Sequence, residues 1–102
     1  MMPHYDIIIV GAGPAGASSA IIAAQSGLNV LLCDKMKFPR EKICGDCINP
    51  KIWPLLNLLR VSEKVKSQPF IRLENICVIN SAGKQINGSV SAFAENPFIA
   101  MK

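Results

Sequence analysis

The sequence predicts an α/β fold that begins with a strand–helix–strand unit, and three observations support this prediction. An apolar run ending at a glycine, a segment with helical spacing and a second apolar run follow one another before residue 34. Parallel strands joined in this way lie side by side, with a right-handed crossover and the helix on one face. The chain has 102 residues, of which 50% are hydrophobic and 18% charged. This length allows one small domain, and this composition excludes an intrinsically disordered chain.

The two strands are expected over residues 5–10 and 30–33. The first reads Tyr-Asp-Ile-Ile-Ile-Val and is stopped by Gly11, and the second reads Val-Leu-Leu-Cys and ends at Asp34. Both are short continuous apolar runs, which are typical of parallel strands covered on both faces. Because two parallel strands are too few for a doubly wound sheet, the sequence predicts an incomplete sheet with exposed outer edges.

The helix between the strands is expected over residues 14–26. Pro14 suits the first helical turn, and Gly27 suits the C-terminal end. This helix belongs to a stretch without formal charge, from Asp6 to Asp34, which is long enough to span a bilayer. Pro14 would break a continuous membrane helix, and the preceding leader lacks the lysine or arginine of a secretory signal. We therefore expect no transmembrane segment and a cytoplasmic location.

The remainder of the chain is predicted to hold a loop, a helix and a β-hairpin. Residues 35–50 contain Pro and Gly and suggest an irregular connection, and helical material is expected over 52–66. Residues 70–80 and 84–91 are expected to pair as a hairpin, because Asn-Ser-Ala-Gly between them is turn chemistry. No repeat or low-complexity segment marks a second domain.

Positive charge is concentrated in the middle of the chain. Residues 35–66 hold eight of the eleven basic residues and three of the seven acidic ones. Only Phe38 and Trp53 accompany this basic stretch, and no nucleic-acid recognition motif is present, so we expect no nucleic-acid partner. Trp53 is interpreted as a packing residue.

The motif that indicates chemistry lies between the first strand and the helix. It is a GxGxxG sequence, formed by Gly11, Ala12, Gly13, Pro14, Ala15 and Gly16. In such a motif Gly11 permits the tight turn, Gly13 lets a pyrophosphate approach the backbone, and Gly16 lets helix and strand pack closely. The free N–H groups at the helix start, with the positive end of its dipole, favour a bound phosphate.

An acid at the end of the second strand completes the dinucleotide-binding pattern. Asp34 follows Gly11 by 23 residues, and its carboxylate can accept hydrogen bonds from an adenosine ribose. The same charge would repel a 2′-phosphate, which disfavours NADP. The neighbouring Lys35 is included among the candidate cofactor-binding residues. Together these features predict a Rossmann-like FAD/NAD(P)-binding fold.

A second motif extends the pattern beyond the strand–helix–strand unit. Residues 38–46 read Phe-Pro-Arg-Glu-Lys-Ile-Cys-Gly-Asp, and Pro50 follows. With the GAGPAG turn, this stretch resembles the FAD-dependent oxidoreductases of the geranylgeranyl reductase and flavin-dependent halogenase group, within the hydroxylase-like flavoproteins. The resemblance covers residues 5–66 well and the hairpin region loosely.

The resemblance implies FAD as the cofactor and adds further site residues. In such proteins the segment matching residues 40–46 runs along the cofactor toward the ribityl chain and the flavin, so the resemblance implies that Arg40, Cys44, Gly45 and Asp46 are FAD neighbours. An arginine suits a phosphate or a flavin edge, and a glycine lets the backbone approach a planar ligand. The role of Lys42 is left open.

The cysteines are candidates for metal ligands and for a redox pair. Cys44 and Cys47 form a CxxC, which can mean a redox pair or half of a zinc site. No second pair exists and His4 is the only histidine, so we expect no metal site. Cys33 and Cys77 are expected to be core thiols of a protein in a reducing compartment.

Three functional interpretations remain open. Residues 1–102 are expected to be the N-terminal portion of an FAD-binding domain, from a longer flavoprotein or a truncated reading frame, and no catalytic residue can be named. The first alternative is an NAD-binding module of a dehydrogenase. The second is a non-catalytic nucleotide-binding remnant completed by another chain. The choice among double-bond reduction, hydroxylation and halogenation depends on sequence beyond Lys102.

Overall fold

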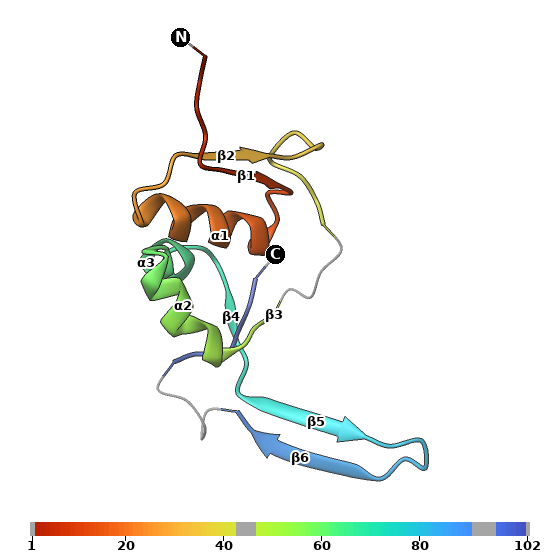
Figure 1. Ribbon diagram of the computed structural model, residues 1–102. Helices are drawn as coiled ribbons and strands as arrows, with labels where there is room; N and C mark the ends of the chain where they lie inside the picture. The colour runs from red at the N-terminus through yellow and green to blue at the C-terminus, as the bar shows by residue number, and fades with distance from the viewer. Residues whose placement is uncertain (1, 43–46, 91–95, 102) are drawn as a thin grey trace. The chain divides into compact units, whose positions relative to one another are not determined.

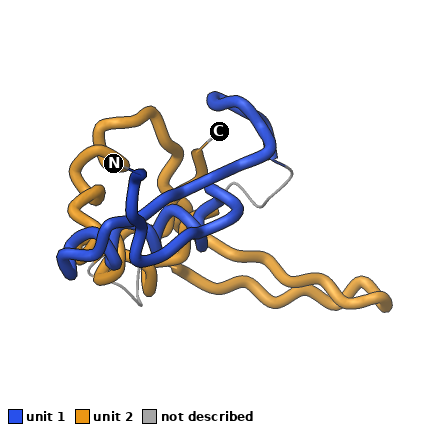
Figure 2. Tube along the Cα trace, turned by 45° about the horizontal axis from the view of Figure 1, so that its top comes forward, with its two compact units in different colours: residues 1–43 blue, residues 44–102 orange. Residues whose placement is uncertain are grey.

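The computed structural model describes residues 2–42, 47–90 and 96–101 (Figure 1). The chain divides into two compact units, residues 1–43 and 44–102 (Figure 2). Within the described residues, no helix has the length and apolar character needed to cross a membrane.

Unit 1 is the predicted strand–helix–strand unit. Strand β1 spans Ile7–Val10, helix α1 spans Pro14–Gln25, and strand β2 spans Val30–Cys33. The strands pair in parallel, from Ile7 opposite Val30 to Val10 opposite Cys33. Gly27 has a φ of +84° directly after the Ser26 cap, as expected for a glycine that ends a helix. The predicted α/β fold and the three elements are confirmed.

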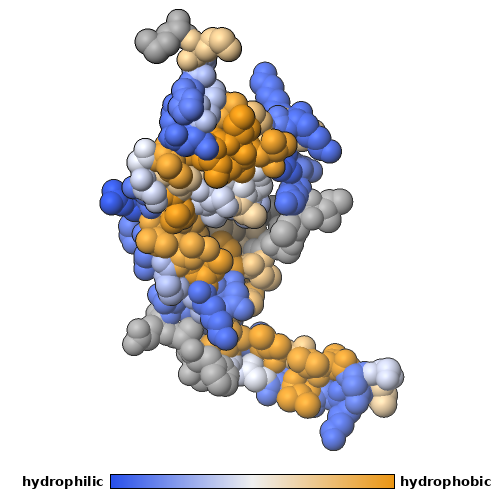
Figure 3. Space-filling view, in the orientation of Figure 1, coloured by the Kyte–Doolittle hydropathy of each residue, from blue (hydrophilic) through white to orange (hydrophobic). Residues whose placement is uncertain are grey.

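The prediction that both faces of these strands are covered is wrong within the described residues. Helix α1 packs against both strands, and Ile9 Cγ2 lies on its side, 3.5 Å from the position of a Cβ on Gly16. The alternate residues face the other way, and Ile8 and Val10 are 60% and 85% exposed. The reason is that this pair of strands carries one helix layer. Figure 3 shows the resulting apolar surface over β1 and β2.

The first half of unit 2 is helical, in agreement with the prediction over residues 52–66. A 3₁₀ turn spans Pro50–Ile52, α2 spans Trp53–Leu58, and α3 spans Ser62–Lys66. The single predicted helix is broken by Arg60, whose φ of +59° is left-handed. Propensity alone gave no indication of this break.

Unit 2 also contains a small antiparallel sheet that the sequence did not predict. Strand β7 (Ile99–Ala100) lies between β3 (Cys47–Ile48) and β4 (Ile71–Arg72). Each strand has only two residues, which is too short for an alternating pattern to be recognised. Such strands are defined by their partners and not by their own sequence.

Trp53 is the centre of the unit 2 core. Its side chain is 1% exposed, and Ile99 is fully buried. The indole Nε1–H donates a hydrogen bond of 2.7 Å to Pro97 O, so the buried polar atom is satisfied. Lys66 Nζ lies 5.3 Å from the centre of the Trp53 ring. The interpretation of Trp53 as a packing residue is confirmed.

The predicted hairpin is present, and it is formed by β5 (Asn75–Ile79) and β6 (Gln85–Ser89). Its first strand is shorter than predicted, because Ile71 and Arg72 pair with β7 in the other sheet. In the connecting turn, Asn80 Oδ1 accepts hydrogen bonds from the N–H groups of Ala82 and Lys84, at 3.0 and 2.9 Å. Gly83 has a φ of +79°. Every residue of both strands is exposed, so this hairpin is held mainly by its ladder and its turn.

Candidate dinucleotide-binding site

The glycine turn begins directly after β1, where the chain must reverse into α1. Gly11 has a φ of +105°, a backbone conformation that L side chains rarely adopt. Its N–H donates a 2.7 Å hydrogen bond to Cys33 O, at the end of the neighbouring strand. The turn is therefore fixed to the carboxyl end of β2, the edge where ligands bind in open α/β sheets.

Gly16 is required by the close approach of α1 to this turn. A Cβ at Gly16 would lie 1.7 Å from Gly11 O and 2.9 Å from Gly11 C. Both atoms are backbone, so they cannot move aside as a flexible side chain could. The structure thus bears out the packing role predicted for Gly16 and the turn role predicted for Gly11.

The first turn of α1 presents backbone amides without a side-chain cap. Gly13 is the N-cap residue, Pro14 carries no N–H, and none of the described side chains caps the helix. The amides of Ala15 and Gly16 lie within the first turn, where no intrahelical carbonyl reaches them. With the positive end of the helix dipole, they form a site suited to an anion.

Asp34 is bonded to the glycine turn itself, which sequence reasoning missed. Its Oδ2 accepts a 2.8 Å hydrogen bond from the Ala12 N–H, and its Oδ1 accepts a 2.7 Å hydrogen bond from the Met36 N–H. These two bonds lower the pKa of Asp34, and the nearby charges of Arg40 and Lys35 lower it further, against an opposing effect of burial. The carboxylate is therefore held ionised as well as positioned.

Arg40 reaches back from the following loop to this carboxylate. Its Nη2 lies 3.7 Å from Asp34 Oδ2, and the two side chains are 17% and 10% exposed. The guanidinium also lies over the Phe38 ring, 5.2 Å from its centre. Its Nε is buried and has no hydrogen-bond partner among the described residues. A buried unpaired donor of this kind favours a ligand with acceptor oxygens.

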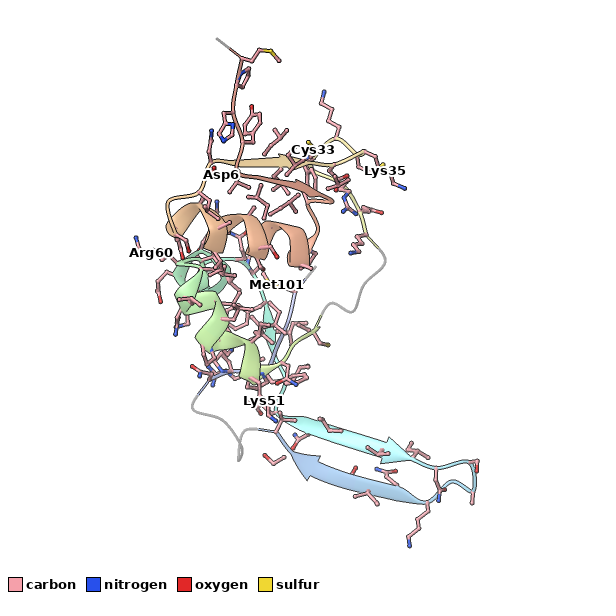
Figure 4. All side chains as sticks on the ribbon, viewed as in Figure 1. Asp6, Cys33, Lys35, Lys51, Arg60 and Met101 are labelled. Atoms are coloured by element: carbon pink, nitrogen blue, oxygen red, sulfur yellow. The ribbon has the colours of Figure 1, made fainter. Side chains whose placement is uncertain are left out.

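A cleft of about 230 Å³ lies between the glycine turn and this loop. Lys35, which follows the end of β2 and is labelled in Figure 4, is one of the residues that line it. The lining residues are Val10, Gly11, Asp34, Lys35, Met36 and Arg40. Of the predicted site residues, the structure thus brings Gly11, Asp34, Lys35 and Arg40 together at this cleft, whereas Gly13, Pro14, Ala15 and Gly16 do not line it.

Three predicted site residues, Cys44, Gly45 and Asp46, lie outside the described residues, and with them the question of a Cys44–Cys47 redox pair. Within the described part of the chain, no group of three or more His, Cys, Asp or Glu side chains could hold a metal ion. The prediction that Cys33 and Cys77 are core thiols is wrong. Both are exposed, because Cys33 ends β2, which is covered by a helix on one face only, and Cys77 belongs to the exposed hairpin.

Comparison with known proteins identifies relatives among reductases and flavin-dependent halogenases. A menaquinone reductase of Mycolicibacterium smegmatis is 48% identical over 51 residues, which are 50% of this chain and 12% of that protein. A flavin-dependent halogenase of Armillaria mellea is 38% identical over 65 residues, covering 64% of this chain and 13% of the relative. The resemblance to FAD-dependent oxidoreductases drawn from the two motifs is confirmed.

The fold matches a solved flavin-dependent brominase with a TM-score of 0.77 and 27% identity, over 98% of this chain and 24% of that one. The chain thus spans a small part of the length of the relatives that it matches. The family model for pyridine nucleotide-disulphide oxidoreductases matches residues 5–99. With the glycine turn, the acid and the parallel strands in agreement, the chain belongs to the pyridine nucleotide-disulphide oxidoreductase family.

Proposed function

We propose that this chain binds the ADP portion of FAD as a segment of a flavin-dependent oxidoreductase. One observation carries the proposal: the glycine turn, the uncapped start of α1 and the Asp34 carboxylate meet at one edge of the β1–β2 pair. An anion-binding helix start and a carboxylate that can accept hydrogen bonds from a ribose lie at the same edge, which suits an adenine dinucleotide.

The residues present fit the two polar parts of such a ligand. The amides of Ala15 and Gly16 would hold the pyrophosphate, and the buried unpaired Nε of Arg40 offers a further donor to its oxygens. Asp34 would accept the ribose hydroxyls with the ionised carboxylate that its backbone bonds maintain. When bound, FAD supplies the redox chemistry of its flavin ring, and the residues described here bind and orient its other end.

Within the flavin-dependent oxidoreductases, we propose that the whole protein is a geranylgeranyl reductase-like enzyme. A menaquinone reductase and a halogenase among the relatives support this group without choosing between reduction and halogenation. Further sequence or a second chain would supply the substrate site and the remaining strands. The cytoplasmic location expected from the sequence stays a prediction, which fractionation of source cells would test.

Binding of a pyridine nucleotide is the second candidate, and membership of the pyridine nucleotide-disulphide oxidoreductase family favours it. The same turn and acid suit NAD as well as FAD, because both contain ADP. The two proposals differ in what the protein retains. A yellow cofactor that copurifies and is identified as FAD supports the first, whereas tight NAD binding without flavin supports the second.

Gly13→Val tests dinucleotide binding by either candidate. A Cβ at Gly13 meets only the ends of two flexible side chains, so we expect the fold to persist while the added bulk blocks the pyrophosphate. Gly88→Ala is the control, because its Cβ would meet nothing within 4 Å. We expect equilibrium dialysis to show loss of FAD and NAD binding in Gly13→Val alone. Undiminished affinity in that variant would show that the phosphate site has been misplaced.

A further inference from the structure

Two basic side chains from the loop after β2 converge on one residue of the glycine turn. A Cβ placed on Gly13 would lie 3.3 Å from Lys42 Nζ and 3.9 Å from Arg40 Nη2. Gly13 is the N-cap of α1, so both cations lie beside the positive end of the helix dipole. Three positive partners thus meet where the proposed pyrophosphate would bind.

The charges in this arrangement are not balanced by the described residues. Among the described residues, Asp34 is the one carboxylate that pairs with Arg40, at 3.7 Å, and Lys42 forms no ion pair. The two positive side chains at this helix end repel each other, and an anion bound between them would offset that repulsion. A pyrophosphate, with two negative charges and several acceptor oxygens, is an anion of matching charge.

We propose that Lys42 is a pyrophosphate ligand that closes the site from the loop side, opposite the helix amides. This inference rests on the proposed function and deepens it, since the sequence left Lys42 open. Lys42 is exposed and its stem is flexible, so its ammonium group can follow the phosphate oxygens. Arg40 acts with Lys42. When the ribose hydroxyls donate hydrogen bonds to the Asp34 carboxylate, the Arg40 guanidinium leaves that carboxylate and pairs with the phosphate.

The test compares three forms of the native polypeptide that carries this sequence: unsubstituted, Lys42→Gln and Lys37→Gln. Lys37 is an exposed lysine of the same loop that, unlike Lys42, has no atom within 4 Å of a Cβ on Gly13, so it is the matched control for net charge. ADP is the probe with a pyrophosphate, and adenosine is the probe without one. Calorimetry measures the affinity for ADP, and nuclear magnetic resonance titration measures the weaker affinity for adenosine.

We expect Lys42→Gln to weaken ADP binding by about tenfold, as for the loss of one charge-assisted hydrogen bond. Adenosine affinity should be the same in all three forms, and Lys37→Gln should bind ADP like the unsubstituted protein. The salt dependence of ADP affinity should also become shallower in Lys42→Gln, because one charge has left the site.

The outcomes separate this inference from the proposed function. An unsubstituted protein that binds neither ADP nor FAD overturns both. Normal ADP affinity in Lys42→Gln overturns the inference alone, because dinucleotide binding survives without the lysine. Equal losses in Lys42→Gln and Lys37→Gln also overturn it, since they indicate an effect of net charge and not of a ligand.

Discussion

The glycine turn of unit 1 and the β5–β6 hairpin of unit 2 use similar residues under different constraints. Both combine β-branched strands with glycines. At the turn, a Cβ on Gly16 would lie 1.7 Å from a backbone oxygen, whereas a Cβ on Gly88 in the hairpin would meet nothing within 4 Å. Packing therefore requires a glycine at position 16, whereas the space around Gly88 would accept a side chain.

The backbone conformation of the glycine turn is therefore more tightly constrained than that of the hairpin. The turn is fixed by Gly11, by Gly16 and by two hydrogen bonds to the end of β2, from the Gly11 N–H to Cys33 O and from the Ala12 N–H to Asp34. The hairpin depends on its own ladder and on the side chain of Asn80. Its apolar side chains along one face, Ile76, Val78 and Ile86, are 46%, 60% and 66% exposed. Substitutions should therefore have unequal effects in the two regions.

The largest contrast is expected between Gly16→Ala and Gly88→Ala. Gly16→Ala forces α1 away from the turn, and should lower the free energy of unfolding of unit 1 by about 3 kcal/mol. Gly88→Ala should change the free energy of unfolding by less than about 1 kcal/mol. Urea denaturation followed by circular dichroism compares them, and fluorescence of Trp53 reports separately on unit 2. Similar losses in both variants would remove the contrast.

The second expected effect is a pH dependence that originates at Asp34. Because its pKa is lowered in the folded state, the folded protein binds fewer protons than the unfolded chain as the pH falls below about 4. The contribution of Asp34 to the free energy of unfolding is therefore complete above the pKa of the unfolded chain, about 4, and is lost as the pH falls through the folded-state pKa. Acid titrations of stability should be steeper for the unsubstituted protein than for Asp34→Asn. Parallel titration curves would contradict this origin.

A smaller effect is expected in the hairpin turn from Asn80→Ala. This change removes the acceptor of two backbone hydrogen bonds, and should reduce local stability by about 1 kcal/mol. Asn80→Asp is the control, because it keeps an oxygen at the same position. Amide hydrogen exchange of β5 and β6 should be faster in the alanine variant alone. Unchanged exchange there would mean that the strand ladder suffices.

The smallest effect is expected from Val78→Thr. Val78 is 60% exposed, so exchanging a methyl group for a hydroxyl should change the free energy of unfolding by less than about 0.5 kcal/mol. Ile99→Val, at a fully buried position, should cost about 1 kcal/mol. Thermal denaturation of the two variants measures the difference. A large loss from Val78→Thr would mean that another surface covers the hairpin in solution.

The sequence predicted best those features that depend on few neighbouring residues. Gly11 and Gly16 occupy the positions that their spacing indicated, and the hairpin forms around the predicted turn. The bonds from Ala12 and Met36 to Asp34 could not be predicted, because they depend on how the turn and the loop pack. The left-handed break at Arg60 could not be predicted either, because arginine rarely adopts this conformation and Arg60 belongs to no recognisable motif.

Asp6 and Asp34 together define the register of the first two strands. Continuous apolar runs leave register weakly specified, because a slip by one residue exchanges one apolar face for another. At one end of the pair Asp6 accepts the Asn29 N–H, and at the other Asp34 accepts the Ala12 N–H, each at 2.8 Å. A slip of about 3.3 Å would break both bonds at once. The carboxylate proposed to hold a ribose therefore also aligns the strands beneath it.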